Sequence, residues 1–358
     1  MRVKIRLADE GDRRIWNDLV WRGGDAEIYH TYEWGEVLER GYGLYVKRLI
    51  AEEGGEIVGV LPYIHFHSVF FGEKLVSLPF SDVAGPATLE GRMDVSQDLL
   101  RELVRDAVGL DVNFVEVRKL GRDEAPLLKE GFVKGFEAYT YFLSTDQPYE
   151  RVARNYSKKI RKNIRKAERE GLEVREARDK GDLSRFYRIY LERMKDFGTP
   201  PAPLSFWEAI WEIFKPRDMV KLIFAVLDDV EVAGFISLLF RDKLYFLLNV
   251  SLRDYWRFRG LNDLLFDWYI RYACSKGYKI VDFGRTRKGT GVLRFKEKGW
   301  GAERQPLNKY YFFFHGDRNP MDSVLSASSI YAKLWRTLIP KPLTPILGGW
   351  IRRRIGDA

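Results

Sequence analysis

Residues 282–301, DFGRTRKGTGVLRFKEKGWG, combine glycines with a dense group of cationic side chains. The letters KIVDF at residues 279–283 are apolar and β-branched enough to predict a buried strand that leads into this loop. Gly284, Gly289 and Gly291 permit positive φ values and a close approach of the backbone to a ligand. Five basic residues share the loop: Arg285, Arg287, Lys288, Arg294 and Lys296.

Backbone amides in such a loop, beside guanidinium and ammonium groups, can hold an anion. The loop therefore predicts a binding site for a phosphate-bearing substrate, with a solvated turn as the alternative. It is not a Walker loop, because the order GxxxxGK[ST] is absent.

The sequence shows no pattern of metal ligands and no pair of cysteines that could form a disulfide. The histidines His30, His65, His67 and His315 are scattered, and His65 and His67 on one strand have no evident carboxylate or third ligand beside them. Cys274 is the single cysteine and has no partner for a disulfide. We expect no metal site and a reducing compartment.

Composition limits the class of protein and its partners. The chain has 358 residues, 46% of them hydrophobic, and a formal net charge of +9. This length predicts two domains, and the positive charge favours anionic partners such as phosphorylated metabolites, RNA or an anionic membrane surface. No stretch reaches the roughly 18 apolar residues of a membrane-spanning helix, and the N-terminus has no apolar signal region, so we expect a cytoplasmic protein.

The order of predicted elements repeats along the chain. A hairpin at 44–66 has a counterpart at 220–240, with an acidic turn followed by similar letters, GGEIVG and DVEVAG. A helix that leads to a strand at 99–120 is matched by one at 266–284, and 127–143 is matched by 294–314. The pattern predicts two copies of one α/β domain, at 1–150 and 151–316, each a twisted mixed sheet covered by helices, with a tail at 317–358.

This order resembles the GNAT acyltransferase fold, here in tandem. Within that superfamily it resembles the Fem-type aminoacyltransferases, which add amino acids from aminoacyl-tRNA to peptidoglycan precursors, and their FemAB-like relatives near exopolysaccharide loci. The similar segments are YHTYEWGEVL (29–38), VGVLPY (58–63), LVSLPFSDVAGP (75–86), YSKKIRKNIRKAEREGLEV (156–174), the loop at 282–301 and the tail at 330–356.

The resemblance implies an acyl- or aminoacyltransferase that forms an amide on an amino group of a cell-envelope glycan or peptidoglycan-like precursor. The donor would be aminoacyl-tRNA, with no tightly bound cofactor. Two alternatives stay open: a GNAT N-acyltransferase that uses acyl-coenzyme A, and a non-catalytic RNA- or membrane-binding protein with this fold.

The resemblance also implies roles for individual residues. Acyl transfer to an amine needs deprotonation of the amine and a positive charge beside the tetrahedral oxyanion. The lysine of the F-K pair, Lys296, is the candidate for that charge as an exposed donor, with Arg285 beside it and Asp282 as its orienting group or as the base. Lys129 precedes Gly131-Phe132 in the first copy, so Lys296 is alternatively an ordinary helix residue. The expected substrate-binding residues are Arg287, Lys288, Gly289, Arg294, Pro79, Phe80, Asp82, Tyr32 and Trp34.

The segment RDYWRFRGLNDLLF partly fits the GNAT pyrophosphate loop, R/Q-x-x-G-x-G/A, whose amides at a helix N-terminus hold the diphosphate of coenzyme A. Its candidate cofactor-binding residues are Arg257, Gly260 and Asn262. Asn262 replaces the final small residue of the motif, and a capped helix start is the alternative.

Two cationic segments suggest binding surfaces. In residues 156–171, Ile160, Ile164 and Ala167 form a narrow apolar stripe and basic residues fill the other faces. This helix is either a surface for phosphates of a tRNA or a diphosphate-linked substrate, or a solvated face. In the tail, prolines at 340, 342 and 345 predict two short amphipathic pieces, which either bind an anionic membrane or dock on the protein itself.

Overall fold

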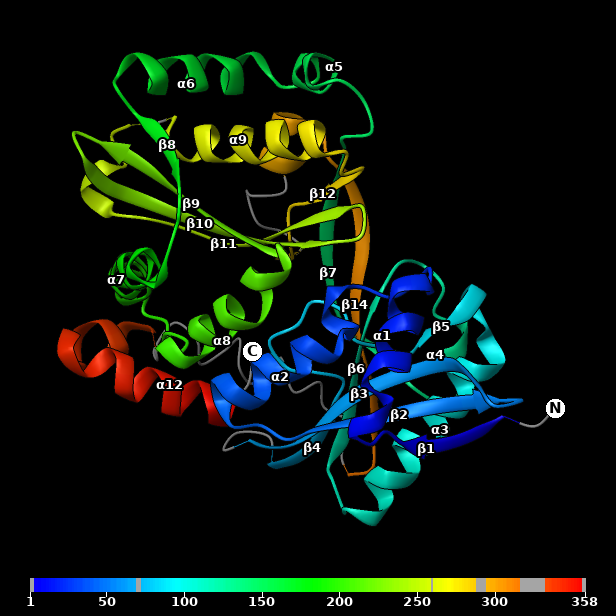
Figure 1. Cartoon of the computed structure of the whole chain (residues 1–358). Coiled ribbons are helices and arrows are strands. Elements are labelled where there is room, and N and C mark those ends of the chain that lie inside the picture. Colours follow the sequence, from blue (N-terminus) through cyan, green and yellow to red (C-terminus); the bar gives the residue numbers. More distant parts are fainter. Residues whose placement is uncertain (1–2, 69–71, 259, 288–293, 316–331, 356–358) are drawn as a thin grey trace. The chain divides into compact units, whose positions relative to one another are not determined.

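The computed structural model describes residues 3–68, 72–258, 260–287, 294–315 and 332–355 (Figure 1). They form two compact units. Unit 1 comprises Met1–Ala138, Pro306–Ile330 and Gly349–Ala358, and unit 2 comprises Tyr139–Gln305 and Tyr331–Gly348.

Unit 1 is built on a mixed sheet. Its strands lie in the order β1 (Lys4–Leu7), β2 (Val46–Glu53), β3 (Glu56–Ser68), β4 (Gly72–Val76), β6 (Phe114–Leu120) and β14 (Glu303–Phe313). The pair β4 and β6 is parallel and the other neighbours are antiparallel. A short strand, β5 (Ala87–Thr88), pairs with β3. Gly54 and Gly55 take positive φ in the β2–β3 turn, which confirms the first predicted hairpin.

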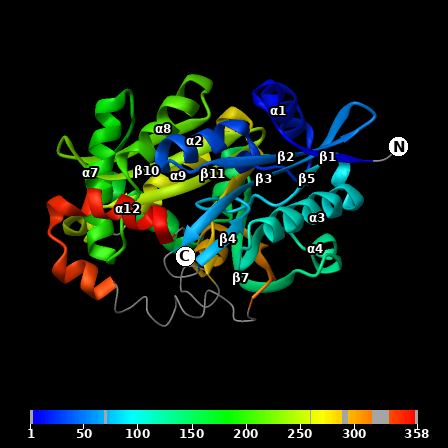
Figure 2. The same ribbon diagram turned by 90° about the horizontal axis from the view of Figure 1, so that it is seen from below.

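Helices cover both faces of the unit 1 sheet. The helices α1 (Arg13–Arg22) and α2 (Tyr32–Tyr42) lie on one face, and α3 (Met93–Gly109) and α4 (Ala125–Lys129) lie on the other (Figure 2). The leucine and valine stripe of α3, Val95, Leu99 and Leu103, is fully buried against apolar residues of β2, β3 and β6. This packing is what the helical spacing of residues 99–112 predicts.

Unit 2 has the same sheet topology. Its strands lie in the order β8 (Glu173–Glu176), β9 (Val220–Leu227), β10 (Val230–Phe240), β11 (Lys243–Ser251), β12 (Ile280–Asp282) and β7 (Val133–Ser144). Only β11 and β12 are parallel among these neighbouring strands. A two-residue strand, β13 (Thr286–Arg287), pairs with β7.

The helices of unit 2 also form two layers, seen in Figure 1. The helix α9 (Leu261–Lys276) packs on one face of the sheet and α6 (Lys158–Arg169) packs on α9, next to α5 (Tyr149–Arg154). The other face is covered by α7 (Lys180–Phe197) and α8 (Leu204–Phe214). Short 3₁₀ turns complete the chain: η1 (Glu10–Asp12), η2 (Ile28–His30), η3 (Leu89–Gly91), η4 (Lys215–Arg217), η5 (Arg253–Tyr255) and η7 (Lys341–Leu343).

The two copies exchange their last strands. The strand β7 follows β6 in the chain but pairs with β12 of unit 2, whereas β14 follows β12 but pairs with β6 of unit 1. The sequence divides the copies at residue 150, and this exchange is why the compact units are instead discontinuous, with residues 139–150 grouped in unit 2 and 306–315 in unit 1.

The tail forms the two predicted helical pieces, residues 332–338 and α12 (Thr344–Ile355). Pro340 and Pro342 lie between them, while Pro345 lies in the first turn of α12, where a missing N–H costs nothing. Among the described helices, none is long and apolar enough to cross a membrane.

Candidate functional site

The parallel strands β11 and β12 separate at their carboxyl ends. Lys243, Leu244 and Tyr245 pair with Ile280, Val281 and Asp282, and the register ends there. Beyond Tyr245, β11 continues along β10 to Ser251, with an extra residue, Leu247, that forms a bulge. Carboxyl ends of parallel strands are where α/β sheets bind ligands, and a strand edge offers its N–H and C=O groups to an extended ligand.

Asp282 closes a tight turn at the end of β12. Its Oδ1 accepts hydrogen bonds from the Gly284 amide, at 2.8 Å, and from the Thr140 hydroxyl. Gly284 has φ of 72°, and a Cβ there would lie 3.0 Å from the Phe246 carbonyl oxygen. Only glycine suits this left-handed position beside a neighbouring strand, so the DFG sequence specifies the turn.

Lys296 contacts the backbone of the same turn. It lies on η6 (Phe295–Gly299), a π-helical turn, and its Nζ donates to the carbonyl oxygens of Phe283 at 2.6 Å and Gly284 at 2.7 Å. The residue is only 6% exposed, which corrects the expectation of an exposed donor. Single π turns are rare and occur often at functional sites.

Aromatic residues hold η6 against the sheet. Trp300, fully buried, meets Tyr156 edge-on at 4.8 Å, and Phe266 stacks on Phe283 at 5.4 Å between ring centroids. Lys296 Nζ itself lies 5.6 Å from the ring centre of Tyr141. The ammonium group is therefore fixed in a largely apolar environment, where its field is screened less than at the surface.

The other predicted residues of the loop are distributed differently. Arg285 is half-buried and Arg294 is exposed. Arg287 ends β13, but its side chain, like Lys288 and Gly289 as a whole, lies outside the described residues. The structure thus places Asp282 and Lys296 around one turn, with Arg285 next to it in the chain.

The start of α9 is closed by α6. A Cβ at Gly260 would lie 2.0 Å from the Asn163 carbonyl oxygen, so the glycine is explained by close helix packing. Asn163 also donates to Asp263 in the first turn of α9, at 2.7 Å. Burial raises the pKa of Asp263 to about 6, while the Asn163 hydrogen bond and Lys159 oppose the shift. A diphosphate at this helix end would meet a buried carboxyl group.

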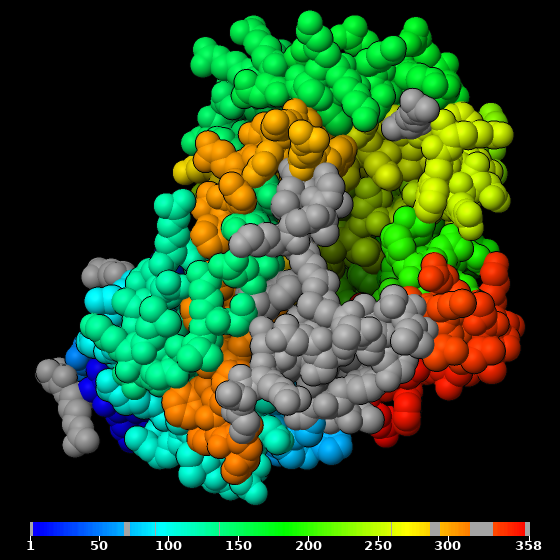
Figure 3. Space-filling model, turned by 180° about the vertical axis from the view of Figure 1, so that it is seen from behind, coloured from blue at the N-terminus to red at the C-terminus, as the bar shows by residue number. Residues whose placement is uncertain are grey.

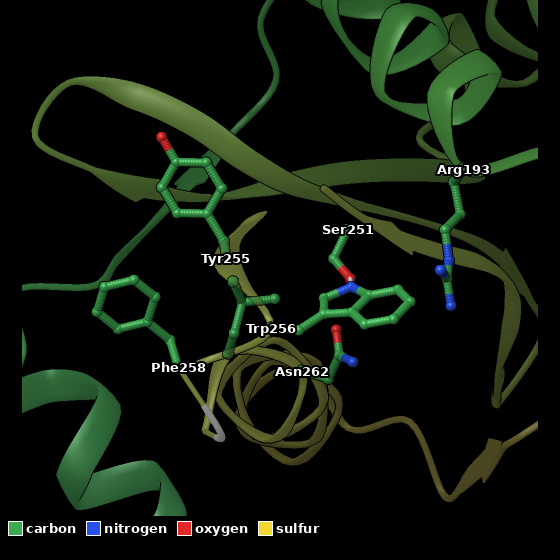
Figure 4. Close-up of a pocket in the computed structure, with 7 residues that line it drawn as sticks. Arg193, Ser251, Tyr255, Trp256, Phe258 and Asn262 are labelled. Carbon is green, nitrogen blue, oxygen red and sulfur yellow. Dashed lines mark hydrogen bonds between the residues drawn. The ribbon is translucent and has the colours of Figure 1, made fainter. Parts of the chain in front are cut away.

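A pocket of 270 Å³ lies beside this helix start, at the end of β11. Its lining includes Arg193 from α7, Ser251, Tyr255, Trp256, Phe258 and Asn262 (Figure 4). The ring of Trp256 lies between Ser251 and Asn262, and its Nε1 donates to Ser251 Oγ at 3.2 Å. Arg257, predicted here from the sequence, is exposed and lies over Phe258.

Sequence reasoning found Asn262 but missed Arg193 and Trp256. Arg193 is distant in the chain, on a helix with no motif. Trp256 lies within the segment RDYWRFRG, and an aromatic residue among arginines just before the helix was the available signal.

In unit 1, the predicted substrate residues surround a strained loop. Leu78 and Phe80 have φ of 54° and 60°, which is uncommon for such side chains and is frequent at binding sites. Phe80 stacks on Tyr42, and Trp34 donates to Ser81 Oγ at 2.6 Å. Trp34 has no exposed surface, so its geometry supports the loop rather than a direct contact with a substrate.

The rest of the loop is held by a buried ion network. Arg118 donates to Glu116 and to the Ser81 carbonyl, and Lys309 lies 3.2 Å from the same carboxylate. Pro79 and Asp82 lie in this loop, Asp82 half-buried. The ring of Tyr32, on α2, lies 4.0 Å from the Arg48 guanidinium carbon.

His65 and His67 on β3 have a carboxylate beside them, which the sequence did not indicate. Glu73 on β4 lies between them, 2.8 Å from His65 Nε2 and 2.5 Å from His67 Nδ1, so a carboxylate does accompany the pair. The pairing of β3 with β4 brings it there, and the linear sequence hides it. Within the described ranges, no group of three or more ligand-type residues is arranged to hold a metal ion.

The cationic helix α6 has the predicted two faces. Ile160, Ile164 and Ala167 are buried on α9, whereas Lys158, Lys159, Lys162 and Arg165 are exposed. Among the described residues, none of these four lies within 4.0 Å of a carboxylate. Figure 3 shows this helix (green, at the top) as an open surface of unit 2.

Comparisons with known proteins agree with the topology. Residues 154–297 match a family described as "Acetyltransferase (GNAT) domain", which agrees with a GNAT fold in this segment. No curated protein matches the sequence.

Solved structures resemble nearly the whole chain. A crystal structure of FemX matches with a TM-score of 0.68 at 13% identity, covering 91% of this chain and 99% of that one. The C-terminal domain of a putative lysylphosphatidylglycerol synthetase from Agrobacterium fabrum matches at 0.59 and 14% identity, covering 91% and 97%. A tandem GNAT protein from the clavulanic acid biosynthesis pathway matches at 0.57 and 10% identity, covering 88% and 100%. The chain therefore has the GNAT fold in tandem.

Proposed function

We propose that this protein is an acyltransferase that forms an amide, by transfer of an aminoacyl or acyl group to an amino group of a cell-envelope precursor. The observation that carries the proposal is the buried ammonium group of Lys296 at the carboxyl end of the parallel strands. The GNAT match at residues 154–297 and the likeness to FemX support it.

The site fits the chemistry of this step. The acceptor amine attacks the carbonyl carbon of the donor ester, a C–N bond forms, and the C–O bond breaks. The amine proton passes to the leaving oxygen. Lys296 stabilises the oxyanion that develops between these events, because a fixed charge in an apolar site needs no reorganisation. Asp282 positions the turn, and Arg285 adds positive charge beside it.

An aminoacyl ester, as in aminoacyl-tRNA, suits the donor site better than acyl-coenzyme A. At the start of α9, where a GNAT enzyme would hold the diphosphate, Gly260 packs closely against the Asn163 carbonyl of α6, and the first turn carries the Asp263 carboxyl group. The exposed basic side chains of α6 offer a surface for the phosphates of a nucleic acid or a diphosphate-linked acceptor.

The test is an amide-forming assay with two donors. Purified protein is mixed with a lysine-containing muramyl peptide and either alanyl-tRNA or acetyl-coenzyme A, and products are weighed by mass spectrometry. We expect the aminoacylated peptide. An acetylated peptide would establish the coenzyme A alternative, and no amide from either donor would favour the non-catalytic alternative.

The tail provides a second part of the proposal, attachment to the surface of an anionic membrane. One side of the tail docks on unit 2: Trp335 is buried, and Lys195 on α7 donates to the carbonyl oxygens of Trp335, at 2.7 Å, and Ile339. Other apolar side chains of the tail are exposed: Leu338 is 67%, Ile346 71% and Trp350 57% exposed.

Charge complements this apolar surface. Residues 323–356 contain no acidic residue and six basic ones, Lys333, Arg336, Lys341, Arg352, Arg353 and Arg354. Each basic residue near an anionic leaflet contributes about 1 kcal/mol, which suffices for reversible binding. A lipid-linked acceptor would be found at that surface.

Liposome flotation tests the attachment. Wild-type protein should float with phosphatidylglycerol vesicles at low salt and not with phosphatidylcholine vesicles. The double variant Ile346→Ser, Trp350→Ser should remain at the bottom, while Val230→Ser, which changes an exposed apolar residue at the start of β10, should float. Equal flotation of all three proteins would contradict the role of the tail.

A further inference from the structure

The pocket at the end of β11 contains the guanidinium group of Arg193, which makes no hydrogen bond to any residue that the structure describes. The guanidinium carbon of Arg193 lies 3.7 Å from the ring centre of Phe197 and 4.1 Å from that of Trp256. A guanidinium group over aromatic rings interacts through its charge and its flat face, and its N–H groups can still donate to another ligand. No described residue accepts a hydrogen bond from Arg193 or forms an ion pair with it at 4.0 Å or less.

No carboxylate of the described residues forms an ion pair that would neutralise the charge of Arg193. Burial lowers its pKa, and the nearby cation Arg253 lowers it further, whereas Asp196 acts in the opposite direction from beyond ion-pair distance. Two guanidinium groups thus share this end of unit 2, and neither forms an ion pair with a carboxylate of the described part of the chain. An arrangement of this kind is stabilised when an anion binds between the cations.

The rest of the lining suits a flat ring. Trp256 is about half exposed, and Tyr255 and Phe258 add aromatic surface. Ser251 and Asn262 supply polar groups, and Asn249, which donates to Asn262 Oδ1 at 3.4 Å, has a buried Oδ1 with no hydrogen-bond partner. A volume of 270 Å³ is small for a ligand pocket and suits one part of a ligand, such as a phosphorylated ring.

We propose that this pocket binds a phosphate group carried on a ring, with Arg193 as the phosphate ligand and Trp256 as the stacking surface for the ring. The phosphate is an ester of a sugar, with or without a nucleobase, so a nucleotide and a sugar phosphate are two sources of the same chemistry. That this group belongs to the substrate of acyl transfer rests on the proposed function, whereas binding itself does not.

The distance between this pocket and the turn at Asp282 indicates which part of a substrate the phosphorylated ring would be. Ser251 lies six residues beyond Tyr245, the partner of Asp282, which corresponds to about 20 Å along an extended strand. The phosphorylated ring would thus be the remote end of an elongated substrate, and its loss would raise KM more than it lowers kcat.

Binding is tested by calorimetry with four probes: inorganic phosphate, AMP, UMP and glucose 1-phosphate. We expect at least one ring phosphate to bind at least tenfold more tightly than inorganic phosphate. Arg193→Met should weaken that binding at least tenfold, and Trp256→Ala should remove the advantage of the ring over inorganic phosphate. Arg188→Met, an exposed arginine on the same helix, is the matched control and should bind as the wild type does.

The outcomes are distinct. Equal affinity of the Arg193 and Arg188 variants, or no heat with any probe at about 5 mM, would overturn the proposal. Thermal melting of each variant shows whether it is folded, and Arg253→Met provides a second test if Arg193→Met unfolds. No assay of turnover is needed, so a failure of the acyltransferase proposal would leave this result standing.

Discussion

Each copy of the fold has a short helical segment before its last strand, α4 in unit 1 and η6 in unit 2. Both segments end at a left-handed glycine, Gly131 in the first copy and Gly301 in the second. In α4 the amide after that glycine, of Phe132, donates to the Leu127 carbonyl; in η6 the corresponding amide, of Ala302, donates to the Lys296 carbonyl. By these hydrogen bonds Lys296 corresponds to Leu127, and both side chains are buried.

The comparison corrects the pairing of Lys296 with Lys129. Lys129 is exposed and corresponds instead to Lys298, which is also exposed. The second copy contains one residue more before its glycine, and the π turn accommodates it. Unit 2 therefore has a buried cation, Lys296, where unit 1 has a core leucine, Leu127. The two copies share a fold but differ in the chemistry that this position can support.

The largest effect is expected when this difference is removed. Lys296→Leu gives unit 2 the residue of unit 1, and turnover should fall at least tenfold, towards the roughly 100- to 1000-fold loss typical of a removed oxyanion donor. The variant should also be about 1–3 kcal/mol less stable, because the carbonyl groups of Phe283 and Gly284 lose their hydrogen-bond donor. Replacement of an exposed lysine would leave stability unchanged.

The controls are the exposed lysines. Lys298→Ala and Lys129→Ala should leave turnover in the amide-forming assay, and the urea midpoint, unchanged. If Lys296→Leu turned over as fast as the wild type, Lys296 would have a structural role and no catalytic one.

The reverse exchange tests the first copy. Leu127→Lys places an ammonium group in the apolar core of unit 1, and the free energy of unfolding should fall by about 3 kcal/mol or more, because nothing there is arranged to accept its hydrogen bonds. Urea denaturation measures this, with Leu128→Lys, at the exposed neighbouring position, as control. Equal stability of both variants would mean that the two sites differ less than their contacts indicate.

A second difference between the copies involves the helix α6, which packs on α9, the unit 2 counterpart of α3. Gly260→Ala should cost roughly 1–3 kcal/mol, because the new methyl group would overlap the Asn163 carbonyl. Gly109→Ala, at the end of α3 with nothing within 4 Å, should be neutral. Identical thermal midpoints would show that α6 moves away easily.

The smallest effect is a pH dependence of the same helix contact. The folded-state pKa of Asp263, about 6, lies above that of an unfolded aspartate, so its contribution to stability is complete below about pH 4 and is lost as pH rises through about 6. Between pH 4.5 and 7.5, wild type should lose on the order of 1 kcal/mol more than Asp263→Asn. Parallel stability curves would assign the pH dependence to other groups.

The repeat, the hairpins, the amphipathic α6 and the divided tail could be predicted from the sequence, because each depends on local periodicity or turn residues. The burial of Lys296 could not, since the letters KEKGW align most simply with KEGF, and only backbone hydrogen bonds reveal the π turn. Arg193 and Glu73 reach their sites through tertiary packing and strand pairing, which a linear pattern does not contain.

The exchange of β7 and β14 has a consequence for how the protein is made. The strand β6 pairs with β14, which lies more than 180 residues further along the chain and is therefore synthesised much later. At about 5–20 residues per second, a ribosome needs roughly 10–40 s to synthesise that interval. Throughout it, one edge of the first sheet is open to other strands, so nascent chains are expected to need a chaperone, and the two copies to complete their folding together after β14 emerges.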